Sequence, residues 1–242
     1  MKTSPLHFIG IGVLLAGSLF AQSPSQVAGW QSMKIQETVE PVFPPHLLLI
    51  GVNRGKARVA IDTDADGKLS EWLVLGYSHQ AFADSAVTAI KEWKFEPARL
   101  QGEAVGTIVE LDFDFSVSGI VVSNPNISEA TEALILRVQP DRFTSLACAA
   151  RDLDRMPTLL FAQAPRYPVA LEKRGLKGTV RIDFFIDGTG AVRLPSGLPD
   201  QDSELAALAI EAVRQWKFTP PTSRGMATLV KASEEFHFGS GS

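Results

Sequence analysis

The residue types that most often carry chemistry are sparse in this sequence. Its 242 residues include one cysteine, Cys148, and four histidines. A lone cysteine forms no intramolecular disulfide, no Cys-x-x-Cys redox pair and no thiolate zinc site. His46, His79 and His237 do not have the spacing of metal ligands. These observations disfavour catalysis by a thiol or by zinc.

One run of carboxylates imitates a metal site. Asp62-x-Asp64-x-Asp66-Gly67 follows the first half of a calcium-binding loop. That loop needs a glutamate at its twelfth position, where this chain has Leu73, and it needs flanking helices, where this chain has strand-like sequence. We therefore predict a hairpin turn at this place and no metal site.

The segment 76–80, Gly-Tyr-Ser-His-Gln, resembles the nucleophile elbow of hydrolases but lacks its final glycine. We interpret it as a loop that leads into a helix. No other set of residues suggests a nucleophile, a general base or a cofactor. The sequence therefore predicts no catalytic residues and no cofactor, and the protein is not expected to be an enzyme.

The composition is that of an ordinary globular protein, with 45% hydrophobic and 21% charged residues. Lysine and arginine number 23 against 27 aspartates and glutamates, for a formal net charge of −4. Such a chain has no basic excess to neutralise a phosphate backbone. Nucleic acid is therefore not an expected partner.

The first residues have the pattern of a secretory signal peptide. A positive charge at Lys2 precedes an apolar run over 8–21, and polar residues follow over 22–26. A helix needs about 20 apolar residues to cross a bilayer, so this run is short for a retained anchor. We expect cleavage after Ala21 and an exported, periplasmic protein with no integral membrane span. The alternative is an uncleaved anchor that holds the protein at the inner membrane, facing the periplasm.

The chain repeats itself at an offset of 123 residues. This offset superimposes, without a gap, Pro45 on Pro168, Gly55 on Gly178, Asp64 on Asp187, Gly67 on Gly190, and Trp93-Lys94-Phe95-x-Pro97 on Trp216-Lys217-Phe218-x-Pro220. A gapless series of this kind indicates a tandem duplication. We predict a signal peptide over 1–21, a lead-in over 22–39, repeat 1 over 40–118, a partly ordered connector over 119–160 and repeat 2 over 161–242.

Each repeat is predicted to run helix, hairpin, helix, strand. Residues 57–61 and 180–186 alternate with the period of two of a half-buried strand and end at glycine-containing turns. A second strand follows over 69–75, and its copy contains Pro195 and Gly197, so it should be short and lie at an edge. Apolar residues with helical spacing then lead to the tryptophans. The fold class is therefore α+β: two two-layer domains, each a three-stranded antiparallel sheet with helices on one face.

The second copy carries a recognisable set of residues: Arg166-Tyr167-Pro168, Gly178-x-Val180-x-Ile182, Asp187 to Gly190, Ala209, Ala212, Trp216-Lys217-Phe218-x-Pro220 and Gly225. This set resembles the TonB C-terminal domain family. The first copy resembles it more weakly, with Phe43-Pro44-Pro45 in place of the Tyr-Pro pair. The resemblance implies a periplasmic domain that accepts an extended peptide of an outer-membrane receptor beside its last strand.

The resemblance implies a function as a protein-binding module. We expect an exported TonB-like protein that binds extended peptides or envelope proteins by strand addition, with a link to TonB-dependent transport. The candidate peptide-binding residues are Arg166, Tyr167, Pro168, Leu229, Lys231, Ser233 and Glu235. Two alternatives stay open: a membrane-anchored energy transducer, and a structural envelope module without a peptide ligand.

The last strand of repeat 1 and the connector carry two further expectations. Glu110, Asp112 and Asp114 alternate along that strand, where they either protect its edge from aggregation or select a basic ligand. We expect protection. The connector contains apolar residues at 134–136 and 143–148, so we expect it to pack on repeat 2 instead of forming a free tether.

Overall fold

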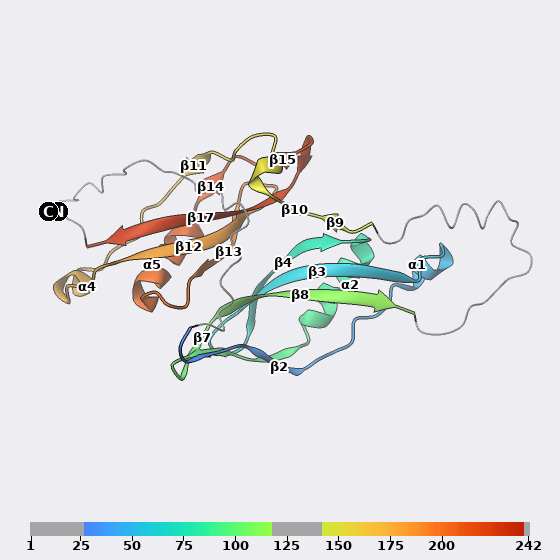
Figure 1. Cartoon of the computed structure of the whole chain (residues 1–242), viewed down its shortest axis with the longest axis horizontal. Coiled ribbons are helices and arrows are strands. Elements are labelled where there is room, and N and C mark those ends of the chain that lie inside the picture. The colour runs from blue at the N-terminus through green and yellow to red at the C-terminus, as the bar shows by residue number, and fades with distance from the viewer. Residues whose placement is uncertain (1–26, 118–141, 240–242) are drawn as a thin grey trace, which may run out of the picture. The chain divides into compact units, whose positions relative to one another are not determined.

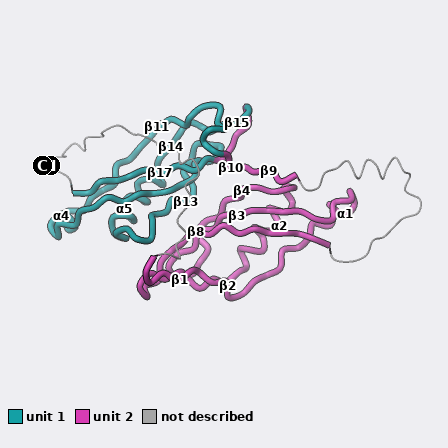
Figure 2. Tube along the Cα trace, viewed as in Figure 1, with its two compact units in different colours: residues 1–19, 149–224, 230–242 teal, residues 20–148, 225–229 magenta. Residues whose placement is uncertain are grey.

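The computed structural model describes residues 27–117 and 142–239. The predicted signal peptide and the apolar residues 134–136 lie outside these ranges. The described residues form two compact units (Figure 2): 27–117, 142–148 and 225–229 belong to one, and 149–224 and 230–239 to the other. In the described part of the chain, no helix has the length and apolar character that a membrane crossing requires.

The first repeat has the predicted order of elements (Figure 1). They are α1 (Pro45–Leu49), β3 (Arg54–Thr63), β4 (Leu69–Tyr77), α2 (Gln80–Ile90) and β8 (Thr107–Ser116). The antiparallel sheet has the order β8-β3-β4-β9, so the predicted three strands gain the two-residue strand β9 (Thr144–Ser145). Helix α2 covers one face, where Phe82 and Ile90 pack against Val59 and Ile61 in a buried core.

The second repeat has the same order. Its elements are α4 (Val169–Lys173), β12 (Gly178–Ile186), β13 (Val192–Gly197), α5 (Ser203–Val213) and β17 (Leu229–Phe238). The sheet order is β10-β17-β12-β13, with β10 (Ala147–Cys148) as a short added strand. Strand β13 is shorter than β4 and lies at an edge, as its proline predicts. Asp202 caps α5, because its side chain accepts a hydrogen bond from the backbone N–H of Leu205.

Short strands complete each repeat. In the first repeat they are β1 (Trp30–Gln31), β2 (Lys34–Glu37), β5 (Lys94–Glu96), β6 (Ala98–Leu100) and β7 (Glu103–Val105). In the second they are β11 (Leu159–Phe161), β14 (Lys217–Phe218), β15 (Thr222–Ser223) and β16 (Met226–Ala227), preceded by a single 3-10 turn, Ala150–Asp152. Strand β2 pairs with β5, and β11 pairs with β14 in the same antiparallel way.

The single gapless offset of 123 is wrong for the first helix of each repeat. Helices α1 and α4 correspond at an offset of 124, which places Pro44 on Pro168 and Leu47 on Leu171. The two leucines are the buried residues of these helices. The physical reason is one extra residue in the first repeat: Gly51, after α1, and Gly55 of β3 are four residues apart, whereas Gly175, after α4, and Gly178 of β12 are three apart.

The two tryptophans fasten the lead-in strands to the rest of each repeat. The indole Nε1–H of Trp93 donates to the carbonyl of Val39 (2.8 Å), and that of Trp216 donates to the carbonyl of Gln163 (2.9 Å). In each repeat, therefore, the chain that precedes the first helix is held beside the Trp-Lys-Phe strand. Residues 159–160, predicted as connector, belong to such a lead-in strand.

The expectation that the connector packs on repeat 2 is wrong for its segment 143–145. Thr144 and Ser145 pair with Tyr77 and Gly76 of β4 in the first repeat. The physical reason is space: a Cβ on Gly76 would lie 2.5 Å from the Phe143 ring, so the glycine lets that ring sit against the sheet. Cys148 is half-buried.

An aspartate side chain holds each hairpin turn. In the first repeat it is Asp64, which lies in the run that resembles a calcium-binding loop. Asp64 Oδ1 accepts hydrogen bonds from the backbone N–H groups of Asp66 and Lys68. In the copy, Asp187 Oδ1 accepts bonds from the Thr189 N–H (2.9 Å), the Thr189 hydroxyl (2.6 Å) and the Ala191 N–H (3.1 Å). The predicted hairpin turn is therefore present in both repeats.

Replacing Asp187 by alanine should destabilise the second repeat in a pH-dependent way. Burial tends to raise the pKa of Asp187, but the bonds from Thr189 and Ala191 and the charge of Arg193 outweigh it, so the pKa lies below its ordinary value of 3.8. A lowered carboxyl pKa adds stability above the ordinary value, and that stability disappears as the pH falls through the lowered pKa. We expect Asp187→Ala to lower the free energy of unfolding by about 1–3 kcal/mol at neutral pH. Urea unfolding at neutral and acidic pH checks this, and an equal loss at both would contradict it.

Candidate functional site

The outer edge of β8 is a long strand edge of the first repeat that has no strand beside it among the described residues. Its inner edge pairs with β3 over the whole strand, from Thr63 opposite Thr107 to Arg54 opposite Ser116. The Val117 N–H donates to the Asn53 carbonyl, and backbone groups alternate sides along a strand, so the odd-numbered residues bond to β3. The even-numbered residues 108–116 direct their N–H and C=O groups outward. Among the described residues, β8 has β3 as its one strand neighbour.

The acidic side chains of β8 are largely neutralised by the neighbouring strand. Arg58 lies directly opposite Asp112, and Nε of Arg58 is 2.7 Å from Oδ1 of Asp112. The hydrogen bond to Asp112 raises the pKa of Arg58. Lys56 lies opposite Asp114, with 3.1 Å between Nζ and Oδ1. These pairs are exposed and contribute little stability, but they leave Glu110 as the acid on this face with the least internal compensation.

Strand β17 presents the same alternation, but the short strand β10 is its neighbour on the outward side, and the first outward position is occupied. The Leu229 N–H donates to the Leu146 carbonyl (2.8 Å), which also accepts from the Thr228 hydroxyl (2.7 Å). Alternation then directs the backbone groups of Lys231, Ser233 and Glu235 to this side, while the intervening residues bond to β12. Four of the predicted binding residues therefore share one edge, and Leu229 has already given its N–H to the chain itself.

The side chains of these residues lie on the sheet face opposite α5. Leu229 and Ser233 are buried, whereas Lys231 and Glu235 are exposed. Lys231 Nζ lies 3.9 Å from Asp183 Oδ2. On the helix side of the same strand, burial raises the pKa of Glu234, and the charge of Glu235 adds to the effect. The exposed face thus carries one cation and one anion next to the edge.

Residues 166–168 lie apart from the outward row of β17, because they precede helix α4. The Tyr167 hydroxyl donates to the Leu176 carbonyl, and its ring centroid lies 5.7 Å from that of Phe238. Pro168 is the N-cap residue of α4. The contacts of Tyr167 and Pro168 are therefore structural, and Arg166 and Pro168 are the exposed members of the three.

The segment that resembled a nucleophile elbow makes structural hydrogen bonds. Ser78 Oγ accepts from the Lys56 N–H (2.9 Å), and His79 Nδ1 accepts from the Ala81 N–H (3.2 Å) as the cap of α2. The predicted loop before a helix is confirmed for Ser78 and His79 alone, because Gly76 and Tyr77 belong to β4 and Gln80 begins α2. Within residues 27–117 and 142–239, no three His, Cys, Asp or Glu side chains are grouped as a metal ion would need.

Sequence reasoning missed the role of Gln201. Its side-chain carbonyl accepts from the Arg181 N–H, and its amide NH2 donates to the Arg181 carbonyl (3.1 Å). The amide thus takes the place of a neighbouring strand at one position of β12, on the side of β13. A single glutamine in a loop gives no signal of this pairing in the sequence.

Comparison with known proteins decides the family. The model for the family described as Gram-negative bacterial TonB protein C-terminal matches the chain twice, over residues 40–117 and 163–239. The chain belongs to this family. The predicted tandem of TonB C-terminal α+β domains is therefore confirmed, and the chain is a TonB-related envelope protein.

Individual relatives cover smaller parts of the chain. Protein TonB of Vibrio cholerae serotype O1 is 41% identical over 66 residues, which make up 26% of this chain and 27% of that protein. The chain thus spans about a quarter of the length of this TonB relative. The solution NMR structure of the Pseudomonas aeruginosa TonB CTD is 23% identical and covers 37% of this chain and 90% of that chain, with a TM-score of 0.31.

Proposed function

We propose that this tandem TonB-like protein is exported to the periplasm and binds extended peptides or envelope proteins by strand addition, in connection with TonB-dependent transport. It acts as a binding module and not as an enzyme. The observation that carries the proposal is the outer edge of β8, where residues 108–116 direct five sets of backbone groups outward beside a fully paired inner edge. An edge of this kind pairs with an extended peptide through main-chain hydrogen bonds.

The expected binding is weak and reversible. Each backbone hydrogen bond contributes about 0.5–1.5 kcal/mol net, and ordering a flexible peptide offsets part of that sum. The paired acids Asp112 and Asp114 support protection of the edge against aggregation, because Arg58 and Lys56 already satisfy their charge. Glu110 is then the side chain that favours a peptide with a basic residue.

The two repeats are proposed to differ in availability. In β17 the first outward position is occupied by Leu146, while residues 231–237 continue the same row. This contact favours, for repeat 2, the structural role in which an edge is closed by the chain itself. Lys231, Ser233 and Glu235 stay the proposed contacts for a peptide at this edge, with β8 the more accessible edge.

Proline at position 110 should weaken peptide capture and leave the fold intact. The Glu110 N–H points away from β3, so Glu110→Pro removes a donor to an added strand without breaking the sheet's own ladder. We expect peptide affinity to fall by about threefold to tenfold, the equivalent of one hydrogen bond. Amide chemical shifts of the full chain, titrated with N-terminal peptides of TonB-dependent outer-membrane receptors, measure this.

Glu110→Ala is the matched control, because it removes the same carboxylate and keeps the N–H group. Shifts confined to residues 107–117 that Glu110→Pro weakens more than Glu110→Ala does would support strand addition. No shifts on either last strand, or equal losses in both variants, would overturn it. Cell fractionation tests the export separately: retention in the membrane after a salt wash would favour the anchored energy transducer.

A further inference from the structure

The lead-in strand pairs of the two repeats are alike in backbone and unlike in chemistry. Strands β2 and β5 pair Ile35 with Phe95 and Glu37 with Lys94. Strands β11 and β14 pair Leu159 with Phe218 and Phe161 with Lys217 at the corresponding positions. Each pair has its register irregularity at the same place. The first repeat therefore serves as an internal reference for what this element needs to fold.

In the first repeat the β2–β5 strand pair is largely polar, and its charged side chains pair with one another. Lys94 Nζ lies 2.7 Å from Glu37 Oε2, and Lys34 Nζ lies 3.6 Å from Glu96 Oε2. Gln36 is exposed between these residues. Ile35, 39% exposed, is the one large apolar residue of this strand, so the strand forms with polar side chains at positions 36 and 37.

In the second repeat large apolar side chains replace those polar ones. Leu160 stands where the first repeat has Gln36, and Phe161 where it has Glu37. Leu160 is 66% exposed, Phe161 53% and the nearby Met156 52%. A cluster of exposed large apolar residues costs solubility and commonly marks an interaction surface. We name these three residues, together with Arg155 and Lys217, the β11 patch.

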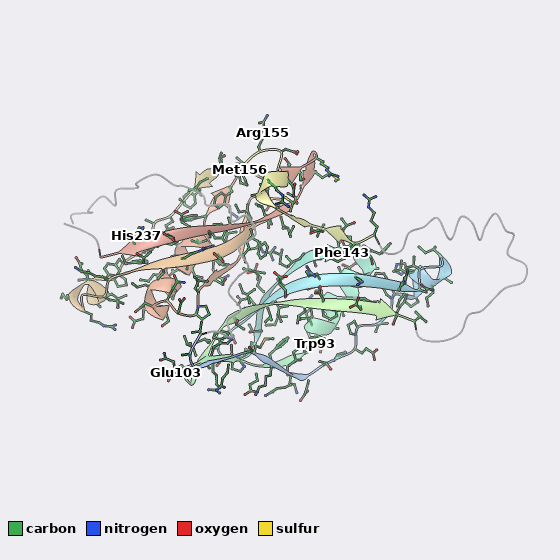
Figure 3. The ribbon with its side chains drawn as sticks, viewed as in Figure 1. Trp93, Glu103, Phe143, Arg155, Met156 and His237 are labelled. Atoms are coloured by element: carbon green, nitrogen blue, oxygen red, sulfur yellow. The ribbon has the colours of Figure 1, made fainter. Side chains whose placement is uncertain are left out.

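Phe161 in place of the first repeat's Glu37 also leaves Lys217 without an acidic partner. Lys217 occupies the position of Lys94, but Phe161 offers no carboxylate, and Lys217 makes no ion pair among residues 27–117 and 142–239. Arg155 likewise has no ion pair in those ranges, and its side chain extends away from the ribbon (Figure 3). The neighbouring Asp154 carboxylate accepts from the Arg224 N–H (2.8 Å). The β11 patch therefore combines apolar surface with two cations that have no acid of their own.

The backbone and a pocket give this patch the shape for an extended ligand. Strand β11 has β14 as its one strand partner in the described chain, so its other edge is open. Next to it lies a pocket of about 440 Å3, lined by Arg155, Met156, Thr158 and Thr219 among others. An edge strand beside a pocket accepts main-chain bonds and one anchoring side chain.

We propose that the β11 patch docks an extended, acidic and apolar segment of a partner protein. A carboxylate of that segment pairs with Lys217 as Glu37 pairs with Lys94, and its apolar side chains cover Leu160 and Phe161. Charge complementarity selects the acid, and the open edge of β11 favours a polypeptide over a lipid surface, which would leave backbone groups without hydrogen bonds. This site is separate from the β8 and β17 edges.

The test exchanges the patch for its counterpart in the first repeat. The variant L160Q/F161E restores the polar pair and supplies Lys217 with an internal carboxylate. It should keep the fold, which circular dichroism checks, because the first repeat folds with these residues. The control L48Q/L49E alters two exposed leucines of α1, at 43% and 88% exposure. The probe is a fluorescent octapeptide that alternates glutamate and leucine, and its match replaces every glutamate by lysine.

We expect the acidic peptide to bind the full chain with a Kd below about 1 mM, measured by fluorescence anisotropy. L160Q/F161E should weaken binding at least fivefold, about 1 kcal/mol, high salt should weaken it too, and L48Q/L49E should leave it unchanged. Equal binding of the lysine peptide, no binding of the acidic one, or no effect of L160Q/F161E would overturn the proposal. So would patch-dependent binding to phosphatidylglycerol vesicles without peptide binding, or a dimer that L160Q/F161E dissociates.

Discussion

Trp216→Ala is expected to lower the free energy of unfolding by about 3–5 kcal/mol, the range for truncation of a buried tryptophan. Its indole is 2% exposed and lies among Phe184, Phe218 and Phe236, with ring centroids 5.6–6.4 Å away. Truncation leaves a cavity and removes the donor to the Gln163 carbonyl. Because that bond holds the lead-in strand, the loss should include β11 as well as the core.

Trp93→Ala is the matched control for this effect. Trp93 makes the same type of bond, to the Val39 carbonyl, but its ring is only half-buried. We therefore expect a smaller loss than at Trp216. Urea unfolding of the full chain gives the two values, and hydrogen exchange assigns each loss to its repeat. Equal losses would show that the hydrogen bond, and not burial of the ring, dominates.

The regular parts of each repeat were predictable because local sequence and burial agree in them. Strands β3 and β12 alternate apolar and polar residues, and α2 and α5 carry their small apolar residues on one face, so the period alone assigns each element. Pro195 demotes β13 to a short edge strand. Asp202 at the start of α5 is a favoured cap.

The lead-in strands were not predictable in the same way. The β2 sequence, Lys-Ile-Gln-Glu, is too short for a period, and its place is fixed by a bond from an indole 54 residues away to Val39. The one-residue shift between α1 and α4 is also invisible to a gapless comparison, since both prolines of the Phe43-Pro44-Pro45 run offer a match. Tertiary contacts decided both features.

The edge of β17 shows how far site prediction extends. Period two is sufficient to group residues 229, 231, 233 and 235 on one side of a strand. The first of these positions is occupied by the Leu146 carbonyl, which also accepts a hydrogen bond from Thr228, 82 residues away in the chain. A local sequence pattern does not predict a contact between segments so far apart. Likewise, the sequence does not predict that Phe161 is exposed, because a phenylalanine in a buried strand would belong to the hydrophobic core. Its exposure follows from the pairing of β11 with β14.

The other large effect is expected at Gly190, which sits in the hairpin turn against the Trp-Lys-Phe strand. Its φ is +82°, and a Cβ would lie 2.0 Å from the Phe218 carbonyl oxygen. The Gly190 carbonyl also accepts from the Phe218 N–H (2.8 Å), so the turn cannot retreat without breaking that bond. Gly67 has the same geometry, with φ +78° and 2.3 Å to the Phe95 oxygen. This contact explains why the turn glycine and the Trp-Lys-Phe run occur together in both repeats.

Gly190→Ala should therefore lower the free energy of unfolding by more than the backbone strain of a left-handed alanine alone. Gly225→Ala provides the comparison, because Gly225 has φ +74° and nothing within 4 Å of its Cβ position. We expect the free energy of unfolding to fall by about 1–2 kcal/mol in Gly225→Ala, from backbone strain. In Gly190→Ala it should fall by at least about 3 kcal/mol, because β14 must also be displaced. Urea unfolding of both variants measures the difference. Similar losses at the two positions would mean that the turn shifts freely, and that its contact with Phe218 does not fix the hairpin against β14.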